Sequence, residues 1–586
     1  MDKNLYISAA KGDITIDLAI ENIKLVNVFS GEIYPANIGI YQDKIVHVDH
    51  TGKEDLKAKE VVDGKGKYAI PGLIDTHLHI ESSMITPGAY AEAILPHGTT
   101  TIVTDPHEIG NVLGEKGIEF MIEASKDLDL RILTFLPSCV PSAPGVETTG
   151  ADFTPDVVQK LIQWENIAGL AEVMNYVGVI EQDDRMLKIV EAAKKTGKTI
   201  QGHAPFVMGR DLSAYIVAGI DSDHECRTTE EAIERIRSGM YVEIRESSFS
   251  MNVNDLAKAI NDKDYVPNVT LCSDDVKASD LIRRGTISHV IRQLIKEGID
   301  PVNAIRFGTI NAAQRLSRSD LGAISPGRIA DIVLLDDLES MMISDVFTSG
   351  KHIVEKGKLQ VEQTKIEPPQ EFLQTVNIPE ISEKDFSIKV NDPAAKEIKI
   401  NVIDYSNNIT NFIKVSVPVE NGEVSLEQDK GTKDPLIYIG VFHRHGRNNN
   451  QAIGVLSGFG IIGGAIATTI AHDCHNLVVL GSNKKDMVIA AKRIKELNGG
   501  MVAVEKGKII AELPLPLAGL MSLESAYDLT PKIDLFERTL NETIMPDNNP
   551  ISRLIPITLA VIPNARMTDI GLVDVNVQEF VPLLVE

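Results

Sequence analysis

Two histidines two positions apart, His77 and His79 in DTHLH, are the first residues in the chain whose types and spacing could bind a metal ion. On a β-strand, side chains two residues apart point to the same face, so both imidazoles could reach one ion. The pair is weak evidence by itself. Whether the pair belongs to a metal site therefore depends on the residues at the matching positions of other strands.

Further residues of metal-ligand type end other strand-like segments. Glu172 lies in GLAEVMNY, an apolar run in which an unpaired carboxylate would be costly to bury. The other candidates are His203 in QGHAP, His224 in SDHEC and Asp274 in CSDD. Six nitrogen and oxygen ligands at one place would suit one or two divalent ions such as Zn²⁺, Mn²⁺ or Fe²⁺.

A series of eight β–α units between residues 71 and 319 would bring these ligands to one mouth. The predicted strands end in LIDTHLH, TIVTDPH, ILTFLPS, GLAEVMN, TIQGHAP, IDSDHE, YVEIRES and VTLCSDD. Such a series is typical of a TIM barrel, in which the carboxyl ends of the strands hold the chemistry. We therefore predict an α/β fold with a (β/α)8 TIM barrel as the metal-dependent catalytic domain.

Segments outside the predicted barrel show other patterns. Residues 1–70 and 320–360 alternate short β-like runs with Gly and Asp turns, which indicates one composite β-sheet domain built from both. Residues 361–384, which include VEQTKIEPPQEF, are expected to form a linker. Residues 385–586 mix strands with helices and are predicted to form a C-terminal α+β domain.

The composition favours a protein that acts on small molecules. The 586 residues include 83 acidic and 58 basic side chains, a net charge of −25, whereas nucleic acids and anionic membranes attract basic surfaces. The sequence has no apolar run of membrane-spanning length, and MDKNLYISAAKGD lacks the apolar core of a signal peptide. Four cysteines are too few for a disulfide framework in so long a chain. We expect a cytoplasmic protein.

The combined motifs resemble the amidohydrolase superfamily and, within it, the bacterial-type adenine deaminases. PGLIDTHLH and PGRIADIVLLD are similar to segments of the superfamily, and IDTHLHIESSMITP, GLAEVMNY, GHAP, DHEC, CSDD and AHDCHN resemble the deaminase branch. The resemblance implies hydrolytic deamination of adenine to hypoxanthine and ammonia, a reaction of purine salvage. It also implies two metal ions, Mn²⁺ or Fe²⁺ rather than Zn²⁺, bridged by Glu172 where relatives carry a carboxylated lysine.

Asp274 and Glu172 are the predicted catalytic residues. A metal ion lowers the pKa of a bound water towards about 7, which supplies a nucleophile for C6 of adenine. A nearby base must then move the proton of this water to the ring or to the leaving ammonia. Asp274 would be both a ligand and this base. Its neighbour Asp275 is expected to contact the purine, with a helix-capping role as the alternative.

Other substrate contacts are predicted from their position at strand ends. Glu81 follows the ligands of the first strand, and Asp105 and His107 follow the second strand in TDPHE. The segment AHDCHN is expected to close over the barrel mouth, with solvent exposure as the alternative. Its candidate substrate contacts are His472, Asp473 and His475. Glu225, next to His224, is expected to point away from the site, because neighbouring strand residues face opposite sides.

Two other functions are left open by the sequence. Another amidohydrolase, such as a guanine deaminase or a cyclic-amide hydrolase, would keep the same ligands. A non-catalytic amidohydrolase-like scaffold would have lost some of them, and the six filled ligand positions disfavour it. The expected partner is a small purine base, with no nucleic acid or membrane, and the expected assembly is a homodimer.

Overall fold

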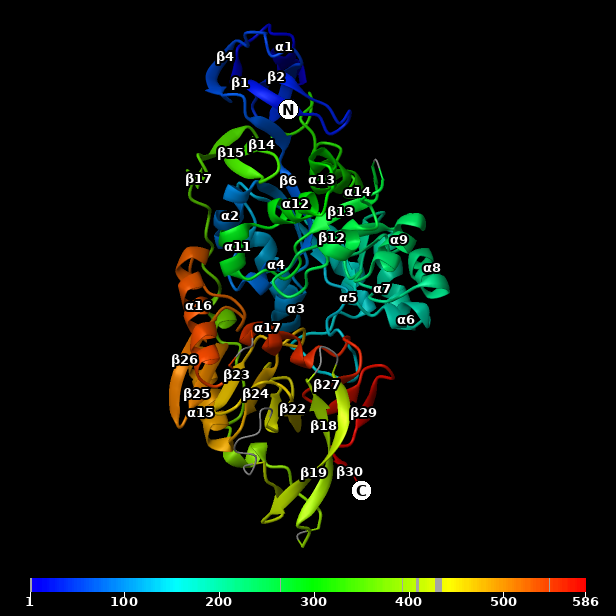
Figure 1. Cartoon of the computed structure of the whole chain (residues 1–586), viewed down its shortest axis with the longest axis vertical. Helices are drawn as coiled ribbons and strands as arrows, with labels where there is room; N and C mark the ends of the chain where they lie inside the picture. Colours follow the sequence, from blue (N-terminus) through cyan, green and yellow to red (C-terminus); the bar gives the residue numbers. More distant parts are fainter. Residues whose placement is uncertain are drawn as a thin grey trace.

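The computed structural model describes residues 3–263, 265–392, 394–406, 410–426, 435–546 and 549–585. The molecule is elongated (Figure 1). A β-sheet region lies at one end, a barrel lies in the middle, and the C-terminal region forms the other end. Within the described ranges, no helix combines the length and the apolar character that crossing a membrane requires.

The described residues include the eight barrel strands predicted from the sequence. The first run of parallel neighbours is β6 (Leu73–Leu78), β7 (Thr99–Thr104), β8 (Arg131–Leu136), β9 (Ile167–Val173) and β10 (Thr199–Gly202). The second run is β11 (Ser222–Asp223), β12 (Tyr241–Arg245) and β13 (Val269–Cys272). A parallel bridge between Leu78 and Asp274 joins the first strand to the last, so their carboxyl ends meet at one mouth.

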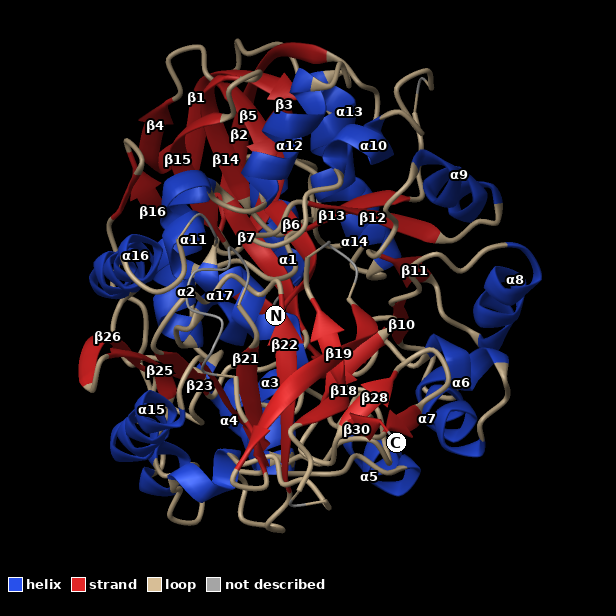
Figure 2. Cartoon of the chain, turned by 60° about the horizontal axis from the view of Figure 1, so that its bottom comes forward, coloured by secondary structure: helices blue, strands red, loops and turns tan. Residues whose placement is uncertain are grey.

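Helices after the barrel strands bury their apolar residues against the barrel, and Figure 2 shows α5 to α9 on its outer side. The start of α9 is a capping box between Thr228 and Glu231, which satisfies backbone groups that the first helical turn leaves free. The helices are α2 (Pro87–Ile94), α3 (His107–Leu113), α4 (Glu115–Ala124), α5 (Pro155–Leu161), α6 (Tyr176–Ile180), α7 (Asp184–Lys194), α8 (Gly209–Ala218), α9 (Thr229–Arg237), α10 (Val253–Ala257), α11 (Ala278–Arg284), α12 (Ile287–Lys296), α13 (Pro301–Arg306) and α14 (Ala312–Arg315).

One sheet combines strands that precede the barrel in the sequence with strands that follow it. Antiparallel pairing of Ile70 with Val333 joins the two segments at β5 and β14. The strands before the barrel are β1 (Ile16–Val26), β2 (Ile33–Tyr41), β3 (Lys44–Asp49), β4 (Ala58–Asp63) and β5 (Tyr68–Pro71), preceded by α1 (Lys3–Ala10). Those after it are β14 (Ile332–Asp337), β15 (Met342–Thr348), β16 (Lys351–Glu355) and β17 (Lys358–Leu359).

The segment that follows this sheet is packed against the rest of the molecule. The Gln363 side chain accepts a hydrogen bond from the backbone N–H of Asp129 at 2.9 Å and donates to the Asp129 carboxylate at 3.1 Å. Phe372 is buried, and its carbonyl accepts a hydrogen bond from the N–H of Ala518. The segment carries two short 3₁₀ helices, Gln370–Leu373 and Glu383–Phe386.

The C-terminal region is built on a second, mostly antiparallel sheet. Its strands are β18 (Glu397–Asp404), β19 (Asn411–Glu420), β20 (Glu423–Val424), β21 (Ile437–Phe442), β22 (Gln451–Ser457), β23 (Ala465–Thr468), β24 (Leu477–Gly481), β25 (Gly500–Glu505), β26 (Lys508–Pro514) and β30 (Leu584–Val585). A smaller sheet contains β27 (Ala565–Met567), β28 (Leu572–Asp574) and β29 (Glu579–Val581). The helices are α15 (Lys484–Leu497), α16 (Ala526–Glu542) and α17 (Pro550–Leu554).

The C-terminal region packs directly against the barrel. Helix α16 lies against α11 and α2, as Figure 1 also shows. Lys277, at the start of α11, forms an ion pair with Glu537 of α16 at 2.9 Å. The loop that contains AHDCHN and the segment around α17 therefore reach the side of the barrel where its strands end.

Candidate active site

His77, in β6, and His79, directly after this strand, each have Nδ1 in a hydrogen bond and Nε2 turned to the candidate ligands. The amide of Gln201 donates to the carbonyl of Thr76, so its oxygen must accept the bond from Nδ1 of His77 at 3.0 Å. Nδ1 of His79 lies 3.0 Å from the carbonyl oxygen of Asp105, which can only accept. Both protons are thus on Nδ1. In its neutral form each imidazole then has a lone pair on Nε2, which is what a metal ion needs.

Glu172, at the end of β9, divides its two carboxylate oxygens between two pairs of imidazoles. Oε1 lies 3.4 Å from Nε2 of His79 and 3.8 Å from Nε2 of His77. Oε2 lies 2.6 Å from Nδ1 of His203 and 3.3 Å from Nε2 of His224. Burial raises the pKa of Glu172, but the imidazoles, His203 first, hold it well below its ordinary value. The side chain is therefore an ionised carboxylate placed between two pairs of nitrogen ligands.

Asp274 also turns its two oxygens to different partners. Its Oδ1 lies 3.2 Å from Nε2 of His79, and its Oδ2 accepts a hydrogen bond from Arg245 at 2.5 Å. The residue lies two positions after the end of β13 and has a left-handed backbone, with φ +57°, a conformation that Asp adopts more readily than most residues. Burial raises the pKa of Asp274, and the guanidinium of Arg245 holds it well below its usual range.

Arg245 and Glu225 belong to the site although the sequence did not place them there. One guanidinium nitrogen of Arg245 lies 2.5 Å from Oε1 of Glu225 and 2.5 Å from Oδ2 of Asp274. The prediction that Glu225 points away is wrong, because β11 ends at Asp223 and strand alternation does not continue. Arg245 is the last residue of β12, and a cation at the carboxyl end of a barrel strand is the signal by which it could have been found.

These side chains fit a metal centre by type, position and burial. Nε2 of His77 is buried and has no hydrogen-bond partner, which leaves its lone pair for an ion. Five groups of side chains each place their ligand atoms within 4.8 Å of one another; one is Glu108, Asp275 and His472, and the other four lie at the predicted ligands. These four are His77, Glu172 and His224; His77, His79 and Asp274; His203, His224 and Glu225; and His79, Asp105, His107 and Glu172. Glu172 is shared by two of these groups, so the arrangement can hold more than one cation.

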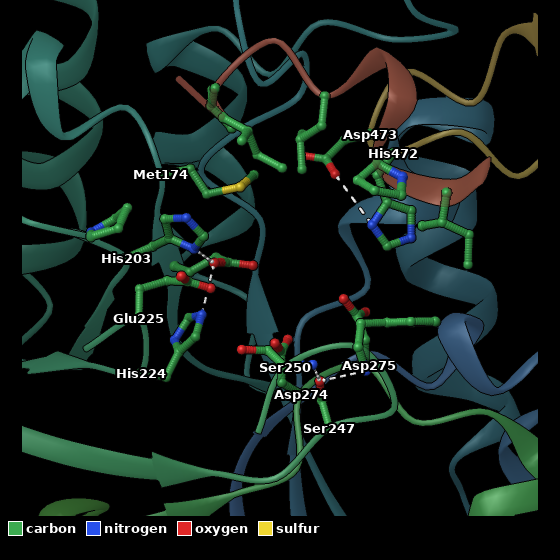
Figure 3. Close-up of a pocket in the computed structure, with 18 of the residues that line it drawn as sticks. Met174, His203, His224, Glu225, Ser247, Ser250, Asp274, Asp275, His472 and Asp473 are labelled. Atoms are coloured by element: carbon green, nitrogen blue, oxygen red, sulfur yellow. Dashed lines mark hydrogen bonds and ion pairs between the residues drawn. The ribbon is translucent and has the colours of Figure 1, made fainter. Parts of the chain in front are cut away.

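The loop from the C-terminal region is buried over the barrel mouth. Figure 3 shows His472 and Asp473 across the cavity from His203 and His224. Asp473 Oδ1 lies 3.6 Å from Nε2 of His107, which begins α3. The loop is therefore not exposed to solvent, and it brings a carboxylate and an imidazole to the ligand group made by the barrel.

A second group of carboxyl side chains lies beside the metal-ligand group. Ser82 Oγ is 2.5 Å from Oε1 of Glu108 and 2.5 Å from Oδ1 of Asp275, so it can donate to only one of them. Burial and then the neighbouring Asp274 raise the pKa of Asp275 to about 6. Burial and then Glu108 raise the pKa of Glu81 to about 8. This part of the site can hold protons near neutral pH.

Hydrogen bonds of two residues, Thr148 and Arg444, fix the position of the C-terminal loop. Thr148, in the loop after β8, accepts a hydrogen bond from the side chain of Asn476 at its carbonyl and donates its N–H to Asp569 at 3.0 Å. The buried guanidinium of Arg444 donates to the carbonyls of His475, Thr375 and Ala518. The loop is thus tied both to the barrel and to its own sheet.

The site opens into one cavity of about 480 Å³. The predicted residues that line it are His79, His107, Glu172, His203, His224, Asp274, Asp275, His472 and Asp473. The remaining predicted residues lie behind this lining. Nδ1 of His77 and the backbone of Asp105 contact other site residues, Glu81 accepts from the N–H of Ile109, and Nε2 of His475 lies 3.9 Å from Glu108.

Comparisons with known proteins match most of the chain. A family model described as Amidohydrolase family matches residues 68–353, and one described as Adenine deaminase C-terminal domain matches residues 407–579. The chain is 38% identical to an adenine deaminase of Kosmotoga olearia over 581 residues, which are 99% of this chain and 98% of that one. It is 41% identical to an adenine deaminase of Thermosipho melanesiensis over 586 residues, 99% of each chain. Among solved structures, a dihydropyrimidinase from Brevibacillus agri covers 60% of this chain and 99% of its own, with a TM-score of 0.44 and 18% identity.

Proposed function

Because the chain belongs to the adenine deaminase family of the amidohydrolase superfamily, we propose that the site at the barrel mouth hydrolyses adenine to hypoxanthine and ammonia with two divalent metal ions. The observation that carries this assignment to the site is the position of Glu172. Its oxygens face two different pairs of imidazoles, as a carboxylate shared by two cations requires. One ion would be held by His77, His79, Asp274 and Glu172, and the other by His203, His224 and Glu172.

The residues around the ligands determine where protons go. Bound ions would lower the pKa of a water molecule and would thereby supply a nucleophile at neutral pH. Oδ1 of Asp274 is the oxygen that faces the ligand group, so it accepts the proton of the attacking water. Arg245 holds Oδ2 of the same carboxylate and fixes its orientation. Asp274 and Glu172 are therefore the proposed catalytic residues. Asp274 transfers the proton, and Glu172 supplies the negative charge that two cations would share.

The purine is proposed to lie between the ligand group and the C-terminal loop. Asp275, whose pKa is raised to about 6, can donate a hydrogen bond to a ring nitrogen of adenine when it is protonated. His107, His472 and Asp473 line the same part of the cavity and are proposed to contact the ring. Glu81, Asp105 and His475 are proposed to act through these residues, because they do not line the cavity.

The metal, the assembly and the location are also part of the proposal. His and carboxylate ligands accept Mn²⁺, Fe²⁺ and Zn²⁺, and the family favours the first two. We propose Mn²⁺ or Fe²⁺, a homodimer and a cytoplasmic location. Light scattering of the purified chain measures the mass against the 64.0 kDa monomer, and a monomer would contradict the dimer.

The function is tested with purified protein freed of metal and then supplied with Mn²⁺. Adenine should be converted to hypoxanthine, followed by its ultraviolet absorbance, and the metal-free protein should be inactive. Asp274→Asn keeps the shape of the side chain but removes the base, so it should abolish turnover. Conversion of guanine or a cyclic amide in place of adenine would contradict the assignment of adenine as the substrate but not the assignment of the metal site.

A further inference from the structure

The cavity extends well beyond the metal ligands. Its outer wall comes from the C-terminal region and includes Thr410, Ser552 and Arg566 beside apolar residues of the 555–563 segment. Cavities of this size, about 480 Å³, hold ligands as large as drugs. Adenine is one fused ring system with a single amino group, and it leaves part of this volume unused. The outer wall therefore has room for a further chemical group.

Arg566 is a buried cation without a carboxylate partner among the described residues. The residue is only 6% exposed and lines the cavity. The guanidinium donates to the Thr410 hydroxyl and to the carbonyl of Ala565, but its Nε–H is buried and has no partner. Burial lowers the pKa of Arg566; the nearby Tyr405 raises it, and no carboxylate of the described residues does so. In a chain with a net charge of −25, a buried uncompensated cation is costly unless something binds it.

Ser552 supplies a second unused polar group on the same wall. It lies in α17, lines the cavity, and its Oγ is buried with no hydrogen-bond partner. A hydroxyl and a guanidinium N–H can both donate to the same kind of acceptor. Two buried donors without acceptors on one cavity wall fit an oxyanion, and a guanidinium matches the geometry of a phosphate in particular.

We propose that Arg566 and Ser552 form an oxyanion subsite that binds a phosphate group at the outer wall of the cavity. The phosphate can belong to an adenine nucleotide, whose base would extend towards the metal ligands, or it can be free inorganic phosphate. The nucleotide form rests on the base occupying the site proposed above. In either form the bound anion shares the cavity with adenine and competes with it.

Inhibition of adenine deamination tests this proposal and distinguishes the two sources. If the subsite takes a nucleotide, AMP should inhibit competitively with an inhibition constant about tenfold or more below that of adenosine, as a charge-assisted hydrogen bond predicts. If it takes free phosphate, inorganic phosphate should inhibit competitively, compared with chloride at the same ionic strength. Equal inhibition by AMP and adenosine together with no effect of phosphate would overturn the proposal.

Variants assign the effect to the subsite. Arg566→Gln should bring the ratio of the AMP and adenosine inhibition constants close to one and remove phosphate inhibition. Ser552→Ala should reduce both effects and is the milder change if Arg566→Gln folds poorly. Arg538→Gln, an exposed arginine on α16, is the matched control and should behave like the unmodified chain. Retention of the AMP preference or of phosphate inhibition in a folded Arg566→Gln protein would contradict the subsite.

A binding measurement separates this proposal from the deaminase assignment. Thermal unfolding of the metal-loaded protein with phosphate, and again with AMP, needs no turnover. At least one of the two should raise the melting temperature of the unmodified chain more than that of Arg566→Gln. An equal response of both proteins would overturn the subsite even if adenine is deaminated. A difference between them would support it even if adenine is not.

Discussion

Arg245 holds one carboxylate oxygen of Asp274 at 2.5 Å, while the other oxygen of Asp274 faces the imidazole of His79 at 3.2 Å. The same guanidinium contacts Glu225 at 2.5 Å. A proton acceptor next to metal ligands is thereby fixed by a cation from the adjacent strand, β12. The orientation of Asp274 depends on this contact as well as on its own backbone.

Replacement of Arg245 by Gln should lower kcat for adenine by roughly 10- to 100-fold, the value of one hydrogen bond to a charged group. The change leaves the Asp274 carboxylate free to rotate and removes the cation that keeps it ionised. Arg227→Gln is the matched control, because Arg227 contacts the other oxygen of Glu225 at 3.2 Å and is half exposed. Equal kcat values for the two variants would contradict the role of Arg245.

Replacement of Glu172 by Gln should reduce the metal content of the protein. The amide has nearly the same shape, but it lacks the charge and the second oxygen that the His203 and His224 side of the site needs. We expect at least one fewer ion per chain after dialysis, measured by elemental analysis. Glu147→Gln removes another buried carboxyl and should leave the metal content unchanged. Full metal content in Glu172→Gln would refute the shared carboxylate.

Replacement of Gln201 by Leu should weaken metal binding by about 10- to 100-fold, as is typical when the partner of a metal-binding histidine is lost. The amide oxygen of Gln201 keeps the proton of His77 on Nδ1. Competition with a chelator measures the affinity. Gln163→Leu, at an exposed position, provides the comparison. Unchanged affinity in Gln201→Leu would show that His77 needs no such partner.

Glu147 should make the stability of the fold depend on pH. Burial raises its pKa from 4.5 to about 8, and its Oε1 accepts from Ser142 and from the N–H of Ala143. Between these pH values the folded chain keeps a proton that the unfolded chain releases. The stabilisation is therefore complete below pH 4.5 and is lost as pH rises through about 8. Over this range the loss is on the order of a few kcal/mol.

Denaturant unfolding at several pH values measures this effect. The free energy of unfolding of the unmodified chain should fall more steeply between pH 6 and pH 9 than that of Glu147→Gln. The amide cannot ionise, so the difference between the two proteins isolates this residue from the other titrating groups. Parallel pH profiles for both proteins would contradict the raised pKa of Glu147.

The barrel and its ligand group could be predicted because both follow from simple periodicities. Two-residue spacing places His77 and His79 on one face, and the position of Glu172 in an apolar strand marks it as unusual. All eight predicted strand ends coincide with strands of the structure. The strand ends meet at one mouth because parallel strands close into a barrel.

The contacts that complete the site could not be predicted because they join distant segments of the chain. Gln201 and Arg245 act on ligands from other strands, and no spacing in the sequence relates them to their partners. The prediction for Glu225 is wrong because β11 is only two residues long, so Glu225 lies in a loop, where side chains do not alternate as they do in a strand. Ser552 and Arg566 lie in a segment without a motif, and only the folded chain brings them to the cavity.

The outer wall of the cavity also sets an order of events during synthesis. Every proposed metal ligand, from His77 to Asp274, leaves the ribosome before Ser552 and Arg566 do. Since large chains fold region by region from the N-terminal side as they are made, the ligands can come together while the mouth is still uncovered. The outer wall of the cavity is the last part of the site to be made. The residues proposed for metal binding and those of the outer wall thus come from parts of the chain that are synthesised at different times.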